Sequence, residues 1–552
     1  MLSRTLWLIL CLSPIIFAYL MQESVQEVEY LLLVDAGSTG SRAFVFRLDA
    51  TWSYTTTDNS IQEASDALDT GSSKQNMLQS RKVYEFPGLK IKRGISTFAH
   101  DKSWEPLVHH LLPMFVNASF IIPRDKWNAT SVYIKGTAGM RLLDADLQIR
   151  IWDHLVHLNA APGNPFLIKR ENMGTIEGNM EAYYAVLASN YIAKSIDARL
   201  RRLSGSDMVG ALDMGGGSTQ LIFYSRQAST SSDTSDTVEN EHMDRESFVA
   251  DLSTPVNEDE FWSHSWLGFG AETIRARIEQ RLIVRASAAR QPQVRSDQGN
   301  IVMDIHNPCT QVGYTSLVSL ADGSHSSEQI NGATQYLLIG TGQPEQCTSL
   351  LFDLLWPSNT CSREIPEGIA NENAERVQMS RTSDARRRPC YLDSIGHPPV
   401  QGHYYAMSVY FYAYDSVRLL LGARGQELLP HWPTPTIEEL ESAAHTFCRT
   451  SWQGDEWHDK HPYTNRKQLP HRCFESLYIL LVLHDAFGFA RDSRQITFAL
   501  DVEGHEVEWA LGFALADAAD TTTSRTSDTA SVAAPAVCSD ARICHGDISE
   551  AT

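Results

Sequence analysis

The chain has 552 residues, 43% of them hydrophobic, and a formal net charge of −21 at pH 7. A chain of this length is too long for one hydrophobic core, so we expect two large lobes. The acidic balance excludes a nucleic-acid binder, which needs a basic surface. It also means that an anionic substrate would need local positive charge, which a bound cation can supply.

The N-terminal segment is apolar. Residues 6–21, which follow Arg4, are almost all hydrophobic, and this pattern is typical of a secretory signal. The run is short for a membrane span, and no small-residue cleavage site stands out, so residues 1–21 fit either a cleaved signal or a signal anchor. We therefore expect the secretory pathway, with the protein secreted, extracellular or in the Golgi lumen, in the last case as a type II membrane protein. Glycosylation sequons at Asn117 and Asn128 agree with this location.

The first chemical motif is a glycine-serine turn between two apolar runs. Residues 31–34 lead into Asp35-Ala-Gly-Ser-Thr-Gly-Ser-Arg, and residues 43–46 follow. The pattern predicts a strand, a tight turn and a second strand. Glycine lets a ligand approach the backbone, and successive N–H groups with nearby hydroxyls can hold phosphate. The predicted phosphate-binding residues of this turn are Gly37, Ser38, Thr39, Gly40 and Ser41.

Two further segments have a recognisable pattern. Residues 133–143 predict a strand, a small-residue turn and the start of a helix, and residues 181–194 predict a helix with a wide apolar face.

A second turn repeats the layout of the first. Residues 208–212 precede Asp213-Met-Gly-Gly-Gly-Ser-Thr-Gln, and residues 221–224 form the next apolar run. A single turn of this kind would be weak evidence, because most are solvated hairpin turns, but two indicate halves of one phosphate site. Asp35 and Asp213 repel phosphate, yet they can hold a hydrated divalent cation that bridges to it. The predicted phosphate-binding residues of this turn are Gly215, Gly216, Gly217 and Ser218.

The cysteines predict disulfide bonds. Of nine cysteines, Cys11 lies in the N-terminal apolar segment and the other eight lie in the C-terminal half. An even number after a secretory signal favours disulfides, and the absence of a Cys-x-x-Cys spacing argues against a metal site. Proximity in the sequence suggests the pairs Cys448–Cys473 and Cys538–Cys544.

Four polar stretches are predicted to be loops or to lack order, because none can bury much apolar surface. They are residues 51–80, 225–258, 369–388 and 515–537. A last helix is predicted to begin within residues 507–514.

Four segments together resemble the apyrase family, the nucleoside tri- and diphosphate diphosphohydrolases. They are, in order, the turn at Asp35, Thr-Ala-Gly-Met-Arg at 137–141, the turn at Asp213, and Trp-Ala-Leu-Gly at 509–512. The resemblance implies an α/β fold of two RNase-H-like lobes, as in actin-like ATPases, with mixed sheets flanked by helices. It places the nucleotide in the cleft between the lobes, and it implies dependence on Ca²⁺ or Mg²⁺.

The resemblance also implies lobe boundaries. Lobe I would comprise residues 30–172 and be completed by roughly residues 500–515. Lobe II would comprise residues 173–499 and carry the disulfides, and residues 516–552 would form a low-complexity tail.

The family's third conserved region fits this chain in two registers. One register places the catalytic glutamate at Glu181 and needs no gap before Asn190-Tyr191, whereas the other places it at Glu177 and needs one. We prefer Glu181 and keep Glu177 as the alternative. The departures from the family pattern are Ala182, where Gly is usual, and Val186, where Trp is usual.

The implied reaction is in-line attack of water on the terminal phosphorus. Glu181 would be the general base. Ser218 and Gln220 would orient the water, because residues i and i+2 of a strand share one face. Thr137 would contact the phosphates, and Arg141 would support the loop through a carboxylate.

The family's nucleobase site is carried over less completely. Tyr412 resembles an aromatic residue that stacks on the base, and Trp509 matches a tryptophan near the cleft. Arg472 stands where cell-surface members carry a second aromatic, and a guanidinium can also stack on a base. Glycine at position 40 resembles the secreted and Golgi diphosphatase branch of the family, whereas many cell-surface members have His there. This resemblance implies a preference for diphosphates.

Two other functions fit the same motifs. One is an exopolyphosphatase-like phosphatase of the same superfamily, although that family usually has Glu at the position of Gln220. The other is a catalytically inactive extracellular homologue, which the substitutions in the third region would suggest. The sequence indicates neither a preferred base nor an oligomeric state.

Overall fold

The computed structural model describes residues 24–56, 74–225, 255–288, 294–297, 300–318, 335–357, 390–457, 460–464, 466–502 and 505–530. Among these, Val28–Asp49 and Arg81–Leu515 form one compact unit, and the remaining described residues belong to a second unit. The predicted signal segment, residues 369–388 and the predicted Cys538–Cys544 pair lie outside the described residues. No helix of the described part is long and apolar enough to cross a membrane.

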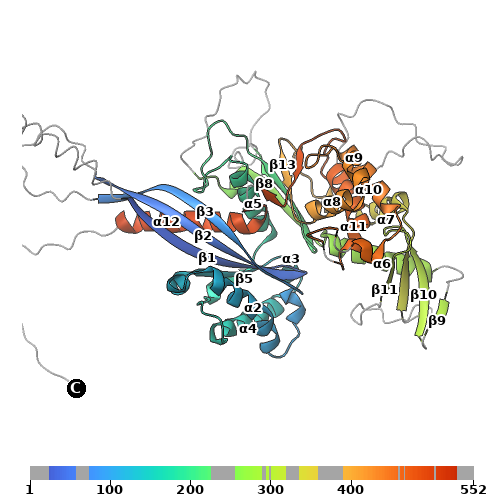
Figure 1. Ribbon diagram of the computed structural model, residues 1–552, viewed down its shortest axis with the longest axis horizontal. Coiled ribbons are helices and arrows are strands. Elements are labelled where there is room, and N and C mark those ends of the chain that lie inside the picture. The colour runs from blue at the N-terminus through green and yellow to red at the C-terminus, as the bar shows by residue number, and fades with distance from the viewer. Residues whose placement is uncertain are drawn as a thin grey trace, which may run out of the picture. The chain divides into compact units, whose positions relative to one another are not determined.

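The first sheet has five strands in the order β3-β2-β1-β4-β5 (Figure 1). They are β1 (Ser24–Ala36), β2 (Gly40–Thr56), β3 (Lys74–Lys92), β4 (Ser131–Gly136) and β5 (Met173–Thr175). Strand β4 pairs in parallel with both β1 and β5. The strand–turn–strand unit predicted around Asp35 is confirmed, with the turn joining β1 to β2.

The second sheet has the same plan. Its strands are β6 (Gly210–Met214), β7 (Ser218–Tyr224), β8 (Phe261–Leu267), β13 (Tyr404–Ala406) and β14 (Ile496–Phe498). Their order is β14-β13-β6-β7-β8, so in each sheet the first strand is central and the next two lie on one side of it. Strands β6, β7 and β8 are antiparallel neighbours, and β13 is parallel to β6 and β14. The predicted turn after Asp213 joins β6 to β7.

Two smaller sheets complete the strands. The first has the order β11-β12-β10-β9 and the second pairs β15 with β16. The strands are β9 (Val294–Asp297), β10 (Asn300–Asn307), β11 (Thr315–Val318), β12 (Gln335–Gly340), β15 (Asp501–Val502) and β16 (His505–Glu506).

The described helices are interleaved with these strands along the chain. The α-helices are α2 (Glu105–Ile121), α3 (Ala138–Arg141), α4 (Ala145–Leu155), α5 (Gly178–Ile192), α6 (Ala271–Ser287), α7 (Pro344–Leu355), α8 (Val409–Leu420), α9 (Ala423–Leu428), α10 (Ile437–Cys448), α11 (Arg472–Leu480) and α12 (Trp509–Ala530). A π-helical turn, Leu481–Ala486, continues α11. Short 3₁₀ turns lie at Ile95–Phe98, Arg124–Ala129, Val156–Ala160, Arg170–Asn172, Glu258–Glu260, Leu392–Ser394, Gly454–Trp457 and Leu469–His471. The helices predicted near residues 138, 181 and 509 are confirmed.

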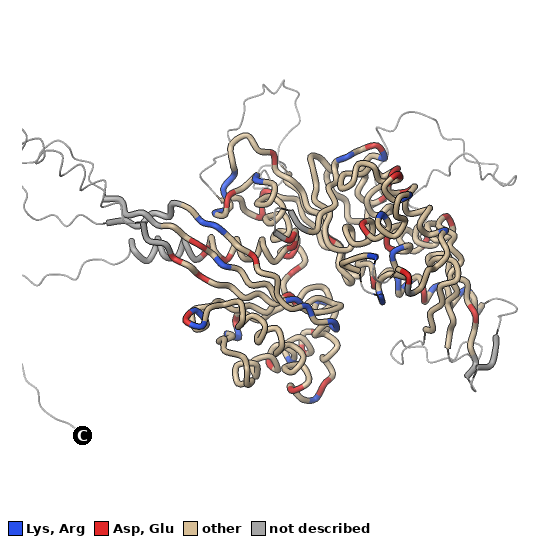
Figure 2. The backbone as a smooth tube through the Cα atoms, viewed as in Figure 1, with Lys and Arg blue, Asp and Glu red and all other residues tan. Residues whose placement is uncertain are grey.

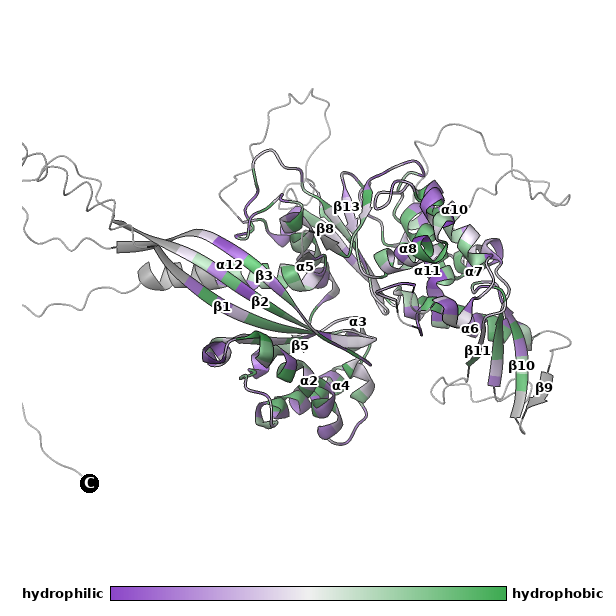
Figure 3. Ribbon diagram, viewed as in Figure 1, coloured by the Kyte–Doolittle hydropathy of each residue, from purple (hydrophilic) through white to green (hydrophobic). Residues whose placement is uncertain are grey.

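The first sheet carries helices on both faces, as the alternation of side chains along β4 shows. Val132 and Ile134 are buried in a core with residues of α2 and α4, which lie side by side (Figure 1). Tyr133, between them, points to the other face and meets Phe513 of α12, with ring centroids 4.9 Å apart. Hydrophobic and hydrophilic residues are mixed along α2 and α4, as expected for helices with one buried side (Figure 3).

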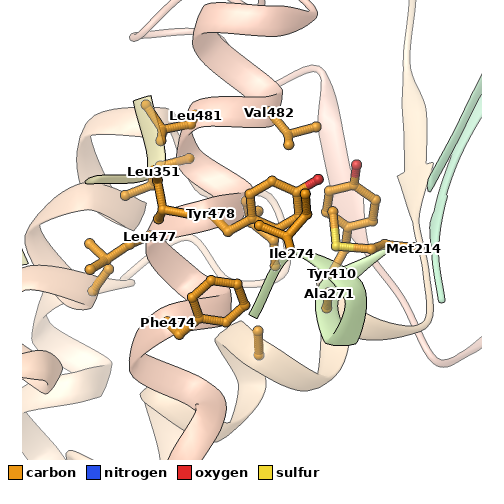
Figure 4. Packing of buried hydrophobic residues seen from close by; sticks show 14 of the residues in the cluster. Met214, Ala271, Ile274, Leu351, Tyr410, Phe474, Leu477, Tyr478, Leu481 and Val482 are labelled. Atoms are coloured by element: carbon orange, nitrogen blue, oxygen red, sulfur yellow. The ribbon is translucent and has the colours of Figure 1, made fainter. Parts of the chain in front are cut away.

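A second core holds the end of β6 in place. Met214 packs near Tyr410 of α8, Ile274 of α6 and Tyr478 of α11 (Figure 4). The two tyrosine hydroxyls are not left unpaired, because Tyr410 Oη lies 3.1 Å from Thr219 Oγ1 and Tyr478 Oη donates to the carbonyl of Phe269 at 2.6 Å. This core therefore anchors the turn that follows Asp213.

Disulfides link helices of this second region. The predicted pair Cys448–Cys473 is confirmed and joins α10 to α11. Cys309 and Cys347 also form a disulfide, and Cys390 is disulfide-bonded.

Two of the polar stretches are more regular than predicted. Strand β2 continues to Thr56 and β3 starts at Lys74, both inside residues 51–80, and α12 continues to Ala530, inside residues 515–537. The expectation of loops was wrong there, because low apolar content does not exclude backbone pairing. Threonine is enriched in strands, and alanine is the best helix former.

Candidate active site

The two predicted glycine loops touch each other. A Cβ atom built on Gly216 of the second loop would lie 2.9 Å from Ser38 Oγ and 2.9 Å from Thr39 Cγ2 of the first loop. A larger residue at this position would require the side chains of Ser38 and Thr39 to shift. The structure thus brings together the two turns that the sequence suggests are halves of one phosphate site.

The second loop is fixed by the start of α6. The carbonyls of Gly215, Gly216 and Gly217 accept hydrogen bonds from the N–H groups of Ala271, Glu272 and Gly268 at 3.0, 3.1 and 2.8 Å. Gly270 packs so closely that an added Cβ would lie 2.4 Å from backbone atoms of residues 216–218. The loop therefore has little freedom to move relative to the second sheet.

The first loop is held by neighbouring backbone. The carbonyl of Thr39 accepts a hydrogen bond from the N–H of Arg93 at 2.9 Å, and the carbonyl of Ala36 accepts one from Thr137 at 3.3 Å. Thr137 is buried directly before α3 and lies beside the first loop. It is predicted to contact the phosphates of a substrate bound at this loop. The Ser41 hydroxyl is buried with no hydrogen-bond partner in the described part of the chain.

A polar cluster lies around the carboxylate of Glu181. Glu181 Oε2 accepts hydrogen bonds from Arg141 Nη1 at 2.8 Å and from Gln220 Nε2 at 3.3 Å. Ser218 Oγ is 3.1 Å from Arg141 Nη2 and 2.9 Å from Gln220 Nε2. The prediction that Ser218 and Gln220 share one face of a strand is confirmed, and the carboxylate expected to bind Arg141 is Glu181.

The two glutamates of the alternative registers have different surroundings. Glu181 lies in the first turn of α5 and is 7% exposed, whereas Glu177 immediately precedes α5 and is exposed. Burial raises the pKa of Glu181, and the charge and hydrogen bond of Arg141 oppose that rise. The structure therefore brings Glu181, not Glu177, to the cluster with Ser218 and Gln220.

Asp35 and Asp213 end the central strands of the two sheets. Oδ1 of each is buried without a hydrogen-bond partner among the described residues. Burial raises the pKa of Asp35 well above its usual value, and Glu181, Glu508 and Asp213 raise it further. Burial, with Glu181, raises the pKa of Asp213 to about 6, although hydrogen bonds from Ser408 and Met214 oppose the shift.

These carboxylates fit a divalent cation. Two buried, unpartnered carboxylate oxygens that repel each other are stabilised by a positive ion. No group of three or more His, Cys, Asp or Glu within the described ranges is placed to hold a metal. The donor set therefore suits a cation that keeps part of its water shell. Charges elsewhere are interspersed in sign along the described backbone (Figure 2).

A second group of charged residues, which the sequence analysis missed, lies beside the first loop. Arg42 forms ion pairs with Glu506 and with Glu508, the latter at 2.7 Å between Nη1 and Oε1. Burial raises the pKa of Glu508 to about 7 in spite of Arg42. Burial, followed by Glu506 and Glu508, raises the pKa of Glu85 to about 8. Glu508 directly precedes the Trp-Ala-Leu-Gly segment, and that adjacency was the available signal.

Two serines were also missed. Ser265 of β8 lies opposite Gln220 of β7 in the strand register, and its Oγ is 3.1 Å from Gln220 Nε2. The polar residues within the otherwise aromatic segment 261–266 were a signal for it. Ser408, which has a left-handed φ of 56°, precedes α8 and hydrogen-bonds to Asp213.

The three candidate base-binding residues differ in exposure. Trp509 is 4% exposed and packs with Tyr184 and Phe513, at centroid distances of 6.4 Å from each. Arg472 is 2% exposed and binds the side chains of Glu475 and Thr464. Tyr412 of α8 is the one that keeps a partly exposed side chain.

Comparison with known proteins agrees with this architecture. Residues 21–530 match the family described as GDA1/CD39 (nucleoside phosphatase). The Golgi apyrase of Saccharomyces cerevisiae is 25% identical over 87% of this chain and 69% of its own length. Mouse ectonucleoside triphosphate diphosphohydrolase 4 is 26% identical over 88% and 72%. The guanosine-diphosphatase of Schizosaccharomyces pombe is 24% identical over 88% and 73%.

A solved structure also resembles the chain. The nucleoside triphosphate hydrolase structure from Neospora caninum superposes with a TM-score of 0.58 at 14% identity, covering 94% of this chain and 98% of the other. This likeness concerns the fold, and it agrees with the predicted α/β architecture.

Proposed function

Because the chain belongs to the GDA1/CD39 (nucleoside phosphatase) family, we propose that the site between the two glycine loops removes the terminal phosphate of nucleoside di- and triphosphates. The family establishes the protein as a nucleoside phosphatase. One observation carries the assignment of the site: Glu181, Ser218 and Gln220 are hydrogen-bonded together beside the place where the loops meet.

The loops bind the phosphates. In this proposal backbone N–H groups of residues 37–41 and 216–218 donate to phosphate oxygens and stabilise the charge that develops on them during transfer. The N–H of Gly215 donates to the carbonyl of Ser218 at 2.9 Å instead. Thr137 adds a hydroxyl donor next to the first loop. Because phosphoryl transfer depends mainly on position and electrostatics, the fixed backbone of the second loop serves catalysis directly.

Glu181 takes the proton of the attacking water. Arg141 and Gln220 both donate to Oε2, so Oε1 is the oxygen that can accept this proton. Arg141 favours the ionised form of the carboxylate against the effect of burial, and a general base must be ionised. Ser218 and Gln220 orient the water, and Ser265 in turn holds the Gln220 amide.

Asp35 and Asp213 hold a Ca²⁺ or Mg²⁺ ion through its water shell. When bound, the ion neutralises charge on the phosphate chain and helps to place it. The supporting observation is the pair of buried carboxylate oxygens that lack partners.

The relatives and the family resemblance also support a cellular location and domain limits for this chain. The named relatives include a Golgi apyrase and an ectonucleoside triphosphate diphosphohydrolase, and they support the secretory pathway. We extend this to a Golgi or extracellular enzyme, with residues 1–21 as a signal or an anchor. Residues 30–172 and 173–499 would form the two lobes, and roughly residues 500–515 would return to the first.

The substrate is proposed to be a diphosphate by preference. The relative named guanosine-diphosphatase and the glycine at position 40 both support this choice. An exopolyphosphatase-like activity and an inactive homologue remain as outcomes of the test.

The test is phosphate release by the purified protein from GDP, UDP, ADP and ATP, with Ca²⁺, with Mg²⁺ and with chelator. We expect release from the diphosphates with a cation and its loss with chelator. Glu181→Gln should lower kcat by at least ~100-fold, as removal of a general base does, whereas Glu177→Gln should retain activity. Release from polyphosphate but from no nucleotide would contradict the proposal, and so would a fully active Glu181→Gln.

A further inference from the structure

We propose that Arg93 binds the phosphate chain of the substrate from the open side of the first loop, as a contact additional to the two glycine loops. This inference rests on the proposed function, since it concerns the phosphates of the same substrate. It adds a cationic side chain that the sequence analysis did not single out. Three features of Arg93 carry it: its packing against the first loop, its strained backbone and its unneutralised guanidinium.

The segment at the end of β3 packs directly against the first loop. The N–H of Arg93 donates to the carbonyl of Thr39 at 2.9 Å. A Cβ built on Gly94 would lie 2.4 Å from a backbone oxygen of the loop, and a Cβ built on Gly40 would lie 2.5 Å from the carbonyl oxygen of Ile91. Glycine on each side therefore lets the two stretches of backbone meet. Arg93 is thus fixed beside Thr39, the exposed residue of the loop.

Arg93 has a backbone conformation that favours glycine. Its φ is 83°, in the left-handed region, which is unfavourable for a residue with a Cβ atom. Besides the bond to Thr39, its carbonyl accepts a hydrogen bond from His110 Nε2 at 3.0 Å, and its Nε donates to Thr97 Oγ1 at 2.8 Å. Strained residues that their surroundings hold in this way cluster at functional sites. An arginine where glycine would fit without strain therefore indicates a use for its side chain.

The guanidinium of Arg93 is held in place but keeps donors for an anion. Its Cζ lies 4.0 Å from the ring centroid of Phe98, which is buried. Neither Nη atom has a hydrogen-bond or ion-pair partner within the part of the chain that the structure describes, and the residue is exposed. The planar fork of an arginine matches the oxygens of a phosphate group. A phosphate beside Thr39 is thus the ligand that this side chain suits.

Two other arginines beside the loops are already neutralised. Arg42 forms ion pairs with two glutamates, and Arg141 pairs with Glu181 at 2.8 Å. A protein with a formal net charge of −21 needs local positive charge to bind a phosphate chain. Arg93 supplies such a charge on the open side of the first loop, and its exposed neighbour Lys92 adds to it.

The test measures the binding of one diphosphate that carries a nucleoside and one that does not. Calorimetry with Mg²⁺ gives the Kd of guanosine 5′-(α,β-methylene)diphosphate and of methylenediphosphonate for the wild type, Arg93→Gln and Arg93→Gly. We expect each variant to raise both Kd values about 10-fold, as for the loss of one hydrogen bond to a charged group. An equal loss for the two ligands identifies the phosphate chain, and not the nucleoside, as the group that Arg93 binds.

Two further measurements separate charge from structure. Salt screens exposed charges, so raising the NaCl concentration from about 0.05 M to about 0.5 M should weaken binding by the wild type more than binding by Arg93→Gln. Arg93→Gly should keep the Tm of the wild type, because glycine adopts a positive φ without strain. Its weaker binding then reflects the missing guanidinium and not a disturbed fold.

Arg124→Gln is the matched control. Arg124 is another exposed arginine that lies over an aromatic ring, with its Cζ 5.6 Å from the centroid of Trp127. It belongs to the turn that precedes β4, whereas the first loop follows Ala36, which pairs with Gly136 at the other end of β4. Arg124→Gln should therefore change neither Kd.

Three results would overturn the inference. They are unchanged Kd values in the Arg93 variants, a loss confined to the nucleotide analogue, and an equal loss in Arg124→Gln. A wild type that binds neither ligand, or that releases no phosphate from nucleotides, would count against the proposed function. Wild-type binding and phosphate release that Arg93→Gln leaves intact would count against the role of Arg93 alone.

Discussion

The two glycine loops join equivalent strands of two sheets with the same order, yet their surroundings differ. In the second loop Gly217 is buried, and the carbonyls of Gly215 and Gly216 accept hydrogen bonds from the first residues of α6. In the first loop the equivalent residue, Thr39, is exposed, and the backbone partners of the loop are the residues directly after β3 and directly before α3. The second loop is therefore the more tightly held of the two, and in the proposed function it would be the rigid reference while the first loop offers an open side to the substrate.

The strands after the loops carry different charges. The strand after the second loop presents Ser218 and Gln220 to Glu181, while the strand after the first presents Arg42 to Glu506 and Glu508. A repeated backbone plan has thus acquired two tasks. In the proposed mechanism one half would place the water, and the other would set the electrostatic field around the phosphates.

The largest effect is expected where the second loop is packed most tightly. Gly270→Ala places a Cβ 2.4 Å from backbone atoms of residues 216–218, and backbone cannot give way as a side chain can. We expect a loss of at least ~100-fold in kcat/KM, because displacement of reacting groups by about 1 Å costs that much. Steady-state kinetics with GDP measures it.

A matched glycine provides the control. Gly174→Ala, in β5, introduces a Cβ with no atom within 4 Å, and it should leave kcat/KM unchanged. Equal behaviour of the two variants would show that the second loop is not the rigid reference.

A smaller effect is expected from Arg141, which connects the first-sheet region to the strand after the second loop. Arg141 comes from the first-sheet region and binds both Glu181 and Ser218. Arg141→Met removes the positive charge that opposes the raised pKa of Glu181, so that pKa rises further. The general base then protonates at higher pH, and the acid limb of the kcat/KM profile should move upward, with about a 10-fold loss at neutral pH.

Arg141→Lys distinguishes charge from geometry. The Lys variant keeps the positive charge but loses the hydrogen bond to Ser218. The acid limb of its kcat/KM profile should therefore lie close to that of the wild type. The proposed role of Arg141 fails if the Met variant keeps the wild-type pH profile. Breaking the buried ion pair should also cost about 3–5 kcal/mol of stability, which thermal unfolding measures.

The smallest effect concerns the acidic surroundings of the first loop. Burial, with Glu506 and Glu508, raises the pKa of Glu85 to about 8 in the folded protein, above its value in an unfolded chain. Such a group stabilises the fold at acid pH, and this stability is lost as the pH rises through about 8. Glu85→Gln should therefore lose less Tm than the wild type between pH 6 and pH 9, by about 2 °C.

The exposed Glu171→Gln is the control for that comparison and should follow the wild type at both pH values. A Glu85→Gln variant whose Tm falls as steeply as the wild type would mean that Glu85 is ionised throughout.

Local patterns in the sequence predicted the elements that carry the proposed phosphate site. Apolar runs around Asp35 and Asp213 predicted both hairpins, and the even cysteine count with close spacing predicted Cys448–Cys473. These predictions were correct because a tight turn, and a disulfide that closes a short segment, depend on residues close together in the chain. The same holds for the shared face of Ser218 and Gln220, which follows from the period of a strand.

Contacts between distant segments could not be predicted in this way. The pairing of Arg42 with Glu506 and Glu508 joins residues more than 460 positions apart, and no local period encodes it. The burial of Arg472 also depends on a partner segment, since Thr464 and Glu475 satisfy its charge. The prediction from composition that residues 515–537 lack regular structure was also wrong for the part that α12 covers, because polar residues do not by themselves end a helix.

The most direct test of the account is whether Asp35 and Asp213 hold one ion for one ligand. Calorimetry gives the Kd of a non-hydrolysable diphosphate analogue for Asp35→Asn, Asp213→Asn and the double variant, with Mg²⁺ and with chelator. We predict a loss of at least ~10-fold for each single variant with Mg²⁺, little further loss in the double variant, and no difference with chelator, because residues that act through one partner are not additive. Additive losses, or losses that persist in chelator, would contradict a shared cation between the two loops.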